Sequence, residues 1–259
     1  IGFLLPNGRR IFNVAIRTIQ LYKEQAIYGV GGGITWDSTW ESEYREVHQK
    51  AAVLYRKQAR FQLITTGKIS QKQLMFEEQH LERLRKASRY FAYPFDPEIL
   101  RQKIEAECQT CDANQDYRLR ISLSKSGEIE FSRQILTPLS PSFCQAKLCL
   151  QEANLNQSFT YFKTTYRPHL SIEEQEKIYH NGKGELLETS IGNLVLKIDG
   201  KLYTPPIRLG ILPGIYHQYL LETGQVEEKV LTLADFAQAE AIYGCNAVRG
   251  LYELQVIGL

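Results

Sequence analysis

The stretch ETSIGNLVLKIDG, residues 188–200, does most to decide the fold of this chain. Apolar side chains alternate from Leu194 to Ile198, and Asp199-Gly200 is a turn pair whose backbone matches the twist of antiparallel strands. The stretch therefore predicts a β-hairpin. Glu188 opens it and is followed by small residues, which suits a carboxylate aimed into a cleft. A solvent-exposed glutamate at a strand edge is the plainer alternative.

The segments around this hairpin predict a mixed α/β architecture. A strand ends on Lys163 in FTYFK (159–163), and a helix is expected from Ser171 to about Asn181. On the carboxyl side of the hairpin, two helices and a closing strand are expected, over 214–224, 233–239 and 252–258. The run TPLSPS (137–142) is typical of a linker and indicates a boundary.

The residues before that linker predict a small α/β unit. A strand over 61–66, a turn at 66–68 and a helix containing HLERL (80–84) come first, and two strands over 117–124 and 128–136 come last. Between them, a proline-rich break at 93–97 ends one helix, and a second helix is expected over 98–108. The spacing of Leu81, Leu84, Ala87 and Phe91 gives the first helix an apolar face.

The N-terminal residues predict a separate β–β–α unit. Residues 11–19 are typical of a buried strand, and residues 25–35 of a strand broken by glycines. Ser38 and Glu41 have capping-box spacing, which predicts a helix running to about Gln58. Such a unit is too small to bury its own core, so we expect it to be the end of a larger domain.

Composition excludes several classes of protein. The net charge is 31 − 29 = +2, too close to neutral to indicate a nucleic-acid or membrane partner. No apolar run approaches the roughly 20 residues that span a bilayer. The chain begins at Ile1 without the pattern of a signal peptide, so we expect a truncated, cytoplasmic fragment. We expect no metal site: Cys108, Cys111, Cys144 and Cys149 have an irregular spacing that favours reduced thiols over a structural zinc site.

Two further segments carry candidate chemistry. Lys163 stands at a strand end among aromatic residues, where desolvation lowers an amine pKa and favours imine chemistry; a lysine that extends into water is the commoner case. The segment LGILPGI (209–215) ends at a predicted helix start, where free N–H groups favour a phosphate. Arg83 would add a charged contact, unless it lies on a solvated helix face.

Pyridoxal-phosphate catalysis needs a lysine, a partner for the pyridine nitrogen and phosphate donors, and these segments offer all three in order. From about residue 60 the chain resembles the fold-type IV pyridoxal-phosphate enzymes, in HLERL, the lysine, ETSIGN, TPP (204–206) and GILPGI. The resemblance implies two subdomains, 59–142 and 143–259, and a homodimer. It makes Lys163 the catalytic, cofactor-bearing lysine and Glu188 the partner of the pyridine nitrogen. The other cofactor-binding residues that it implies are Arg83, Asn193, Leu212, Gly214 and Ile215.

Within that family, KTTYR (163–167) and CNAVRG (245–250) look most like aminodeoxychorismate lyase, which makes 4-aminobenzoate and pyruvate. On this resemblance Arg167, Asn246 and Arg249 bind the substrate. AIRT (15–18), GGGI (31–34) and EYRE (43–46) resemble the last part of chorismate-binding synthases.

The N-terminal resemblance makes residues 1–58 a remnant in which Arg17 and Gly32 match substrate-carboxylate contacts and Glu46 a magnesium ligand. The order of domains is that of a synthase–lyase fusion for folate biosynthesis. A glutamine amidotransferase is the partner expected for the parent synthase.

Three departures and two rivals accompany this interpretation. The lyase branch has a histidine where Phe162 stands, an arginine where Tyr216-His217 stand, and a glutamate–threonine pair where Ile64-Thr-Thr66 stands.

One rival function is that of a branched-chain or D-amino acid aminotransferase on the same scaffold. The other is a non-catalytic domain of a synthase complex.

Overall fold

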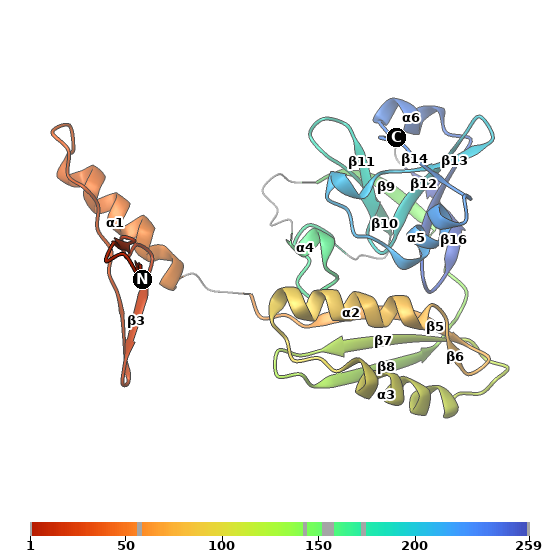
Figure 1. The fold of residues 1–259 in the computed structure, drawn as a ribbon. Coiled ribbons are helices and arrows are strands. Elements are labelled where there is room, and N and C mark those ends of the chain that lie inside the picture. Colours follow the sequence, from red (N-terminus) through yellow and green to blue (C-terminus); the bar gives the residue numbers. More distant parts are fainter. Residues whose placement is uncertain (1, 56–58, 142–143, 152–157, 172–174, 258–259) are drawn as a thin grey trace. The chain divides into compact units, whose positions relative to one another are not determined.

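The computed structural model describes residues 2–55, 59–141, 144–151, 158–171 and 175–257. The chain divides into two compact units, Ile1–Ala59 and Arg60–Leu259 (Figure 1). Among the described residues, no helix is long and apolar enough to cross a membrane.

The first unit contains two short hairpins and one helix. Strand β1 (Gly2–Leu4) pairs with β2 (Arg10–Phe12), and β3 (Ile19–Tyr22) pairs with β4 (Gln25–Tyr28); α1 spans Trp40–Tyr55. The strand predicted over 11–19 is wrong, because pairing stops at Phe12 and resumes at Ile19 in a different hairpin. The strand predicted over 25–35 ends at Tyr28, before the glycine run.

The cap of α1 lies one residue later than predicted. Thr39 Oγ1 accepts a hydrogen bond from the Ser42 backbone N–H at 3.3 Å, whereas Ser38 Oγ donates to Glu43 Oε1 at 2.7 Å. The predicted helix end near Gln58 lies outside the described residues. No described residue of α1 is buried, and Phe3, Val14, Ile16 and Leu21 are exposed. This exposure is what the sequence predicts for a unit without its own core.

Between residues 63 and 135 lies an antiparallel sheet of order β6–β5–β7–β8, with bounds Gln73–Leu74, Leu63–Ser70, Tyr117–Leu123 and Ile129–Ile135 (Figure 1). The turn predicted at 66–68 is wrong. Thr66, Gly67 and Lys68 pair in register with Arg120, Leu119 and Arg118, so β5 continues to Ser70. The full ladder satisfies backbone groups that a turn there would have left unpaired.

Helices α2 (Glu77–Phe91) and α3 (Pro97–Gln109) cover one face of this sheet. Their buried side chains share a core with the strand residues that alternate toward that face; the core includes Leu84, Leu100, Ile104, Leu63, Leu119 and Ile121. Asp96 caps α3 by accepting the N–H of Glu98 at 2.9 Å. The opposite face of the sheet stays free for other contacts, because side chains alternate along a strand.

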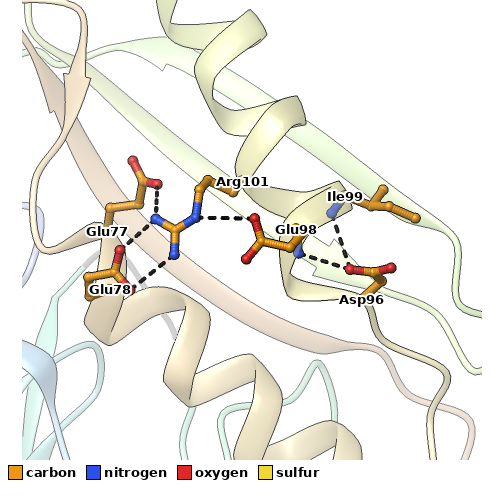
Figure 2. Close-up of polar contacts among 6 residues, drawn as sticks. All are labelled: Glu77, Glu78, Asp96, Glu98, Ile99 and Arg101. Carbon is orange, nitrogen blue, oxygen red and sulfur yellow. Dashed lines mark hydrogen bonds and ion pairs between the residues drawn. The ribbon is translucent and has the colours of Figure 1, made fainter.

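An arginine on α3 joins the starts of the two helices. Arg101 pairs with Glu77 at 3.1 Å and with Glu78 at 2.5 Å, and lies 3.9 Å from Glu98 (Figure 2). The hydrogen bond from Arg101 holds the pKa of the Glu78 carboxyl below its usual value. This cluster is on the surface, so it tethers the helices rather than forming part of the core.

The described residues from 144 to 257 contain a larger sheet whose central order is β14–β13–β12–β11–β10–β9–β17; β15 also pairs with β12, and β16 pairs with β15. The strands span Glu227–Glu228, Lys201–Thr204, Asn193–Ile198, Leu186–Thr189, Glu176–His180, Gln145–Leu150, Gln255–Val256, Ala241–Asn246 and Gly250–Glu253. Strand β10 runs parallel to β9 and antiparallel to β11. The predicted hairpin is confirmed as β12–β13, which pairs Ile198 with Lys201 across Asp199-Gly200.

Other predictions in this part are partly wrong. The strand expected over 159–163 is a short helix, α4 (Ser158–Tyr161). The helix expected from Ser171 to about Asn181 is wrong over Glu176–His180, which form strand β10 because β9 and β11 pair with both of its edges. Residues 172–174 of this prediction lie outside the described residues. The closing strand is interrupted at Leu254 into β16 and β17. Helices α5 (Ile215–Glu222) and α6 (Leu233–Gln238) agree with the predicted ones.

Candidate functional site

A cavity of about 800 Å³ is lined by residues of both parts of the second unit. One wall is the free face of the β5–β7–β8 sheet, with Ile64, Thr66 and Gln134. The other wall consists of the segments 163–170, 188–193, 212–215 and 245–249. The strands predicted over 61–66 and 117–124 and the stretch 188–193 therefore meet at one place.

Lys163 lies in the cavity wall because the backbone of residues 163–165 pairs with the start of β5. Its carbonyl oxygen accepts the Ile64 N–H at 2.9 Å, and the Thr165 N–H donates to the Gln62 carbonyl at 2.9 Å. Burial, and then the nearby charges of Arg83 and Arg167, hold the pKa of the Lys163 amine well below its ordinary range. The amine is thus disposed to be uncharged, the state in which it can react with a carbonyl or accept a proton.

Aromatic rings fix the segment that carries Lys163. Phe162 stacks on Tyr90 with ring centroids 4.6 Å apart, and its ring lies 5.4 Å from that of Phe91. Phe159 packs edge-on against Phe61 at 5.1 Å. Phe162, which stands where the lyase branch has histidine, is therefore part of the packing between this segment and α2.

Glu188 projects into the cavity from the end of β11 and is 2% exposed. One carboxylate oxygen lies 3.5 Å from Arg167 Nη2; the other, Oε1, is buried and has no hydrogen-bond partner among the described residues. Burial raises the pKa of Glu188 to about 7, against the opposing effects of Arg167 and the Leu212 N–H. An arriving cationic N–H donor would satisfy the free oxygen and favour its ionised form.

The start of α5 forms another wall of the site. Asn193 Nδ2 donates to the Leu212 carbonyl at 2.8 Å, and a side chain at Gly214 would overlap Asn193 Oδ1. Gly214 is the N-cap of α5, so the first N–H groups from Ile215 onward have no partner within the helix. Arg83 reaches this segment from α2, donating to the Pro213 carbonyl at 2.7 Å.

The three predicted substrate residues lie in the same cavity. Arg167 faces Glu188, and its Nε and Nη2 are buried without a hydrogen-bond partner among the described residues. Asn246 Oδ1 accepts the N–H groups of Val248 and Arg249, each at 2.9 Å, and so shapes the turn. Arg249 donates to the Thr137 carbonyl in the segment between the subdomains.

Sequence reasoning missed Arg118 and Arg120 on β7. Both residues line the cavity, with Gln134 across the ladder from Arg118. Burial holds the pKa of Arg118 below its ordinary value, and the charge of Arg120 adds to this effect. The alternation of arginines in YRLRISLS was the available signal, since side chains two apart in a strand share a face.

Three buried histidines near the site are held neutral. His80 Nδ1 lies 2.6 Å from Thr65 Oγ1, and burial holds its pKa well below the usual range. Burial lowers the pKa of His169 and of His217 to about 4. His217, in α5 where the lyase branch has arginine, therefore brings no positive charge to this helix at neutral pH.

In the first unit, two of the three predicted residues come together. An ideal Cβ at Gly32 would lie 3.6 Å from Glu46 Oε1, and Lys50 links the two by pairing with Glu46 at 2.5 Å and donating to the Gly31 carbonyl at 2.8 Å. Arg17 is exposed, in a left-handed backbone conformation between the two hairpins. Glu46 thus has a lysine as its near neighbour.

No set of metal ligands is found among the residues that the structure describes. They contain no group of three or more His, Cys, Asp or Glu side chains placed to hold an ion. Cys108, in the last turn of α3, and Cys111, just after that helix, are both buried, and Arg133 Nη1 lies 3.2 Å from Cys111 Sγ.

The residues of the cavity fit pyridoxal phosphate. The free Glu188 oxygen suits a protonated ring nitrogen, and the start of α5 with Arg83 suits a phosphate. The Lys163 amine lies in the same cavity. Together, this mixed α/β fold and this site define a domain of the pyridoxal-phosphate enzymes.

Comparison with known proteins identifies the family. The model of the class IV amino-transferases matches residues 62–257, and that of the chorismate binding enzymes matches residues 1–56. A crystal structure of a putative amino-acid aminotransferase from Mesorhizobium loti is 25% identical, covers 76% of this chain and 100% of its own, and has a TM-score of 0.65. A putative 4-amino-4-deoxychorismate lyase from Legionella pneumophila is 18% identical over 75% of this chain and 82% of its own, with a TM-score of 0.61.

An uncharacterized protein of Haemophilus influenzae is 29% identical over 122 residues, which is 47% of this chain. The match spans 61% of the length of that relative. The chain belongs to the class IV amino-transferase family, whose members depend on pyridoxal phosphate.

Proposed function

We propose that residues 60–259 form an aminodeoxychorismate lyase domain, which converts 4-amino-4-deoxychorismate into 4-aminobenzoate and pyruvate. The observation that carries this proposal is the charge of the cavity. Among the described residues, its lining includes the arginines Arg83, Arg118, Arg120, Arg167 and Arg249, but a single carboxylate, Glu188. Such a lining favours a cofactor phosphate together with a substrate that bears two carboxylates, as this one does.

Each end of the cofactor has a place in this proposal. Arg83 and the backbone from Leu212 to Ile215 hold the phosphate, and Asn193 keeps that backbone in place. Glu188 binds the ring nitrogen and Arg167 orients Glu188. When bound, pyridoxal phosphate supplies an electron sink that stabilises negative charge next to the substrate's nitrogen.

The chain's own residues supply the binding and the proton transfer. Arg118 and Arg120 bind one substrate carboxylate, and Arg249 with Asn246 binds near the other. The uncharged Lys163 Nζ accepts the proton from the ring carbon that bears the amino group. Loss of the enolpyruvyl group as pyruvate then makes the ring aromatic, with no water or other co-reactant consumed.

The match of residues 1–56 to chorismate binding enzymes supports a wider proposal. In it, residues 1–58 are the tail of a synthase that makes the lyase substrate, and the whole serves folate biosynthesis in the cytoplasm. The parent would work with a glutamine amidotransferase, and the lyase domain would form a homodimer.

Amino-group transfer is the second candidate, favoured by the likeness to the Mesorhizobium loti aminotransferase. A pyruvate-release assay separates the two. Purified protein loaded with pyridoxal phosphate should release pyruvate from 4-amino-4-deoxychorismate without an added keto acid. Amino transfer from branched-chain or D-amino acids to 2-oxoglutarate, without pyruvate release, would contradict the lyase proposal. A colourless protein that binds no cofactor would point to the non-catalytic rival.

A further inference from the structure

Glu176 is a fully buried carboxylate beneath the turn that connects β11 and β12. It begins β10 and is not among the residues that line the cavity. Burial of an ionisable carboxylate costs free energy unless hydrogen bonds compensate. The contacts of Glu176 therefore indicate what it does.

Those contacts all lead to the turn or to its support. Glu176 Oε1 accepts the Thr189 hydroxyl and, at 3.3 Å, the Ile191 N–H. The Tyr252 hydroxyl donates to Glu176 Oε2 at 3.2 Å. Burial raises the pKa of Glu176, whereas the bonds from Thr189, Ile191 and Tyr252 favour its ionised form.

The turn itself is closed by Thr189. Its N–H donates to the Gly192 carbonyl at 2.9 Å, and its hydroxyl oxygen accepts the Gly192 N–H at 3.0 Å. Gly192 leaves no room for a side chain, because an ideal Cβ would lie 2.5 Å from the Cys245 carbonyl oxygen and 3.2 Å from the Tyr252 hydroxyl. The turn has therefore little freedom while Glu176 and Tyr252 are in place.

This turn carries the cavity residues on its two sides. Glu188 precedes Thr189, and Asn193 follows Gly192. We propose that Glu176 is a positioning residue that fixes the Thr189–Gly192 turn and thereby aims the Glu188 carboxylate at the ring nitrogen of the cofactor. The inference rests on the cofactor site of the proposed function.

The test compares two ligands that differ at one atom. Pyridoxal phosphate has a ring nitrogen for Glu188, whereas its carbocyclic analogue has a C–H group there. The dissociation constants of both ligands are measured for wild type, Thr189→Val and Glu176→Leu. Thr189→Val keeps the volume of the side chain but removes its hydroxyl. The preference for pyridoxal phosphate should fall about tenfold or more in both variants, as expected for a weakened hydrogen bond to a charged group. General loosening of the fold would weaken both ligands equally and leave the preference unchanged.

Conservative and control variants complete the test. Glu176→Gln keeps an oxygen that can accept the Thr189 and Ile191 bonds, and Thr189→Ser keeps the hydroxyl, so both should retain most of the preference. Glu185→Gln is the matched control: it lies in the same hairpin region and accepts Asn181 Nδ2 at 2.7 Å, but it does not contact the turn. An unchanged preference in Thr189→Val, or an equal loss in Glu185→Gln, would overturn the inference.

The positioning inference and the proposed function can fail separately. Amide hydrogen exchange at Ile191 and Gly192 is measured in cofactor-free protein, where Glu176→Leu should speed exchange about tenfold or more. Wild-type protein that binds no pyridoxal phosphate would refute the cofactor site alone. Unaltered exchange at both amides would refute the hold of Glu176 on the turn, whatever the cofactor does.

Discussion

Lys163 is the residue on which the proposed chemistry depends most directly. We expect Lys163→Ala to abolish pyruvate release and the absorbance of lysine-bound cofactor, because alanine has no amine to bind the cofactor or to accept a proton. The circular-dichroism spectrum should stay unchanged, since the backbone of residue 163 makes the bonds to β5. Lys183→Ala, an exposed lysine, is the control. A variant that keeps both absorbance and turnover would place the cofactor on another lysine.

Glu188 should make stability depend on pH. Its folded pKa of about 7 exceeds the ordinary value of 4.5, so the folded cofactor-free protein binds the proton more tightly than the unfolded chain does. The stabilisation that this proton binding gives to the folded state is therefore fully present below pH 4.5. It is lost as pH rises through 7, which lowers the free energy of unfolding by about 3 kcal/mol. Denaturant unfolding of wild type and Glu188→Gln should show this loss in wild type alone.

The same variant tests the role of Glu188 in the reaction. Glu188→Gln should retain some bound cofactor but turn over much more slowly, because glutamine cannot hold a pyridinium charge. Equal pH profiles, or wild-type turnover, would show that Glu188 has another role.

Arg120 tests the substrate side of the cavity. Arg120→Gln should raise the KM for 4-amino-4-deoxychorismate about tenfold or more and change kcat little, because it removes a contact made before and during the reaction. Arg133→Gln changes an arginine on β8 that pairs with Glu107 at 3.1 Å instead of lining the cavity, and should leave KM unchanged. Equal KM values for wild type and Arg120→Gln would remove this residue from substrate binding.

At the scale of elements, Arg101 holds the starts of α2 and α3 together (Figure 2). Arg101→Ala should lower the melting temperature modestly at low salt, and the difference should shrink as salt screens the charges. Because the pKa of Glu78 is lowered in the folded state, the ionised Glu78 carboxylate stabilises the fold at pH values above its unfolded pKa. This stabilisation is lost as pH falls through the folded value, so the difference should also shrink in acid. A salt-independent difference would mean that Arg101 acts through packing.

At the scale of the whole chain, residues 1–59 should be dispensable for the lyase reaction. This unit has exposed apolar strand residues, and Glu46 is paired with Lys50. Its deletion should leave pyruvate release by residues 60–259 unchanged and raise or maintain soluble yield. Calorimetry of the intact chain should detect no magnesium-dependent binding of chorismate, since one carboxylate rarely holds magnesium alone. Such binding would contradict this view of the unit.

The sequence by itself determined what depends on neighbours along the chain. The β12–β13 hairpin and helices α2, α3, α5 and α6 could be predicted because turn pairs, apolar spacing and proline breaks act locally. The order of Lys163, Glu188 and the 209–215 segment sufficed to indicate the family and its cofactor.

Only the tertiary structure decided the features that depend on distant partners. Residues 176–180 form a strand because β9 and β11 pair with both edges, and β5 passes through Gly67 because β7 pairs beside it. The arginines of β7 reach the cavity, and Glu176 reaches the turn at Thr189, through contacts between residues far apart in the sequence. Backbone pairing and burial are set by those neighbours, so propensities within one segment could not reveal them.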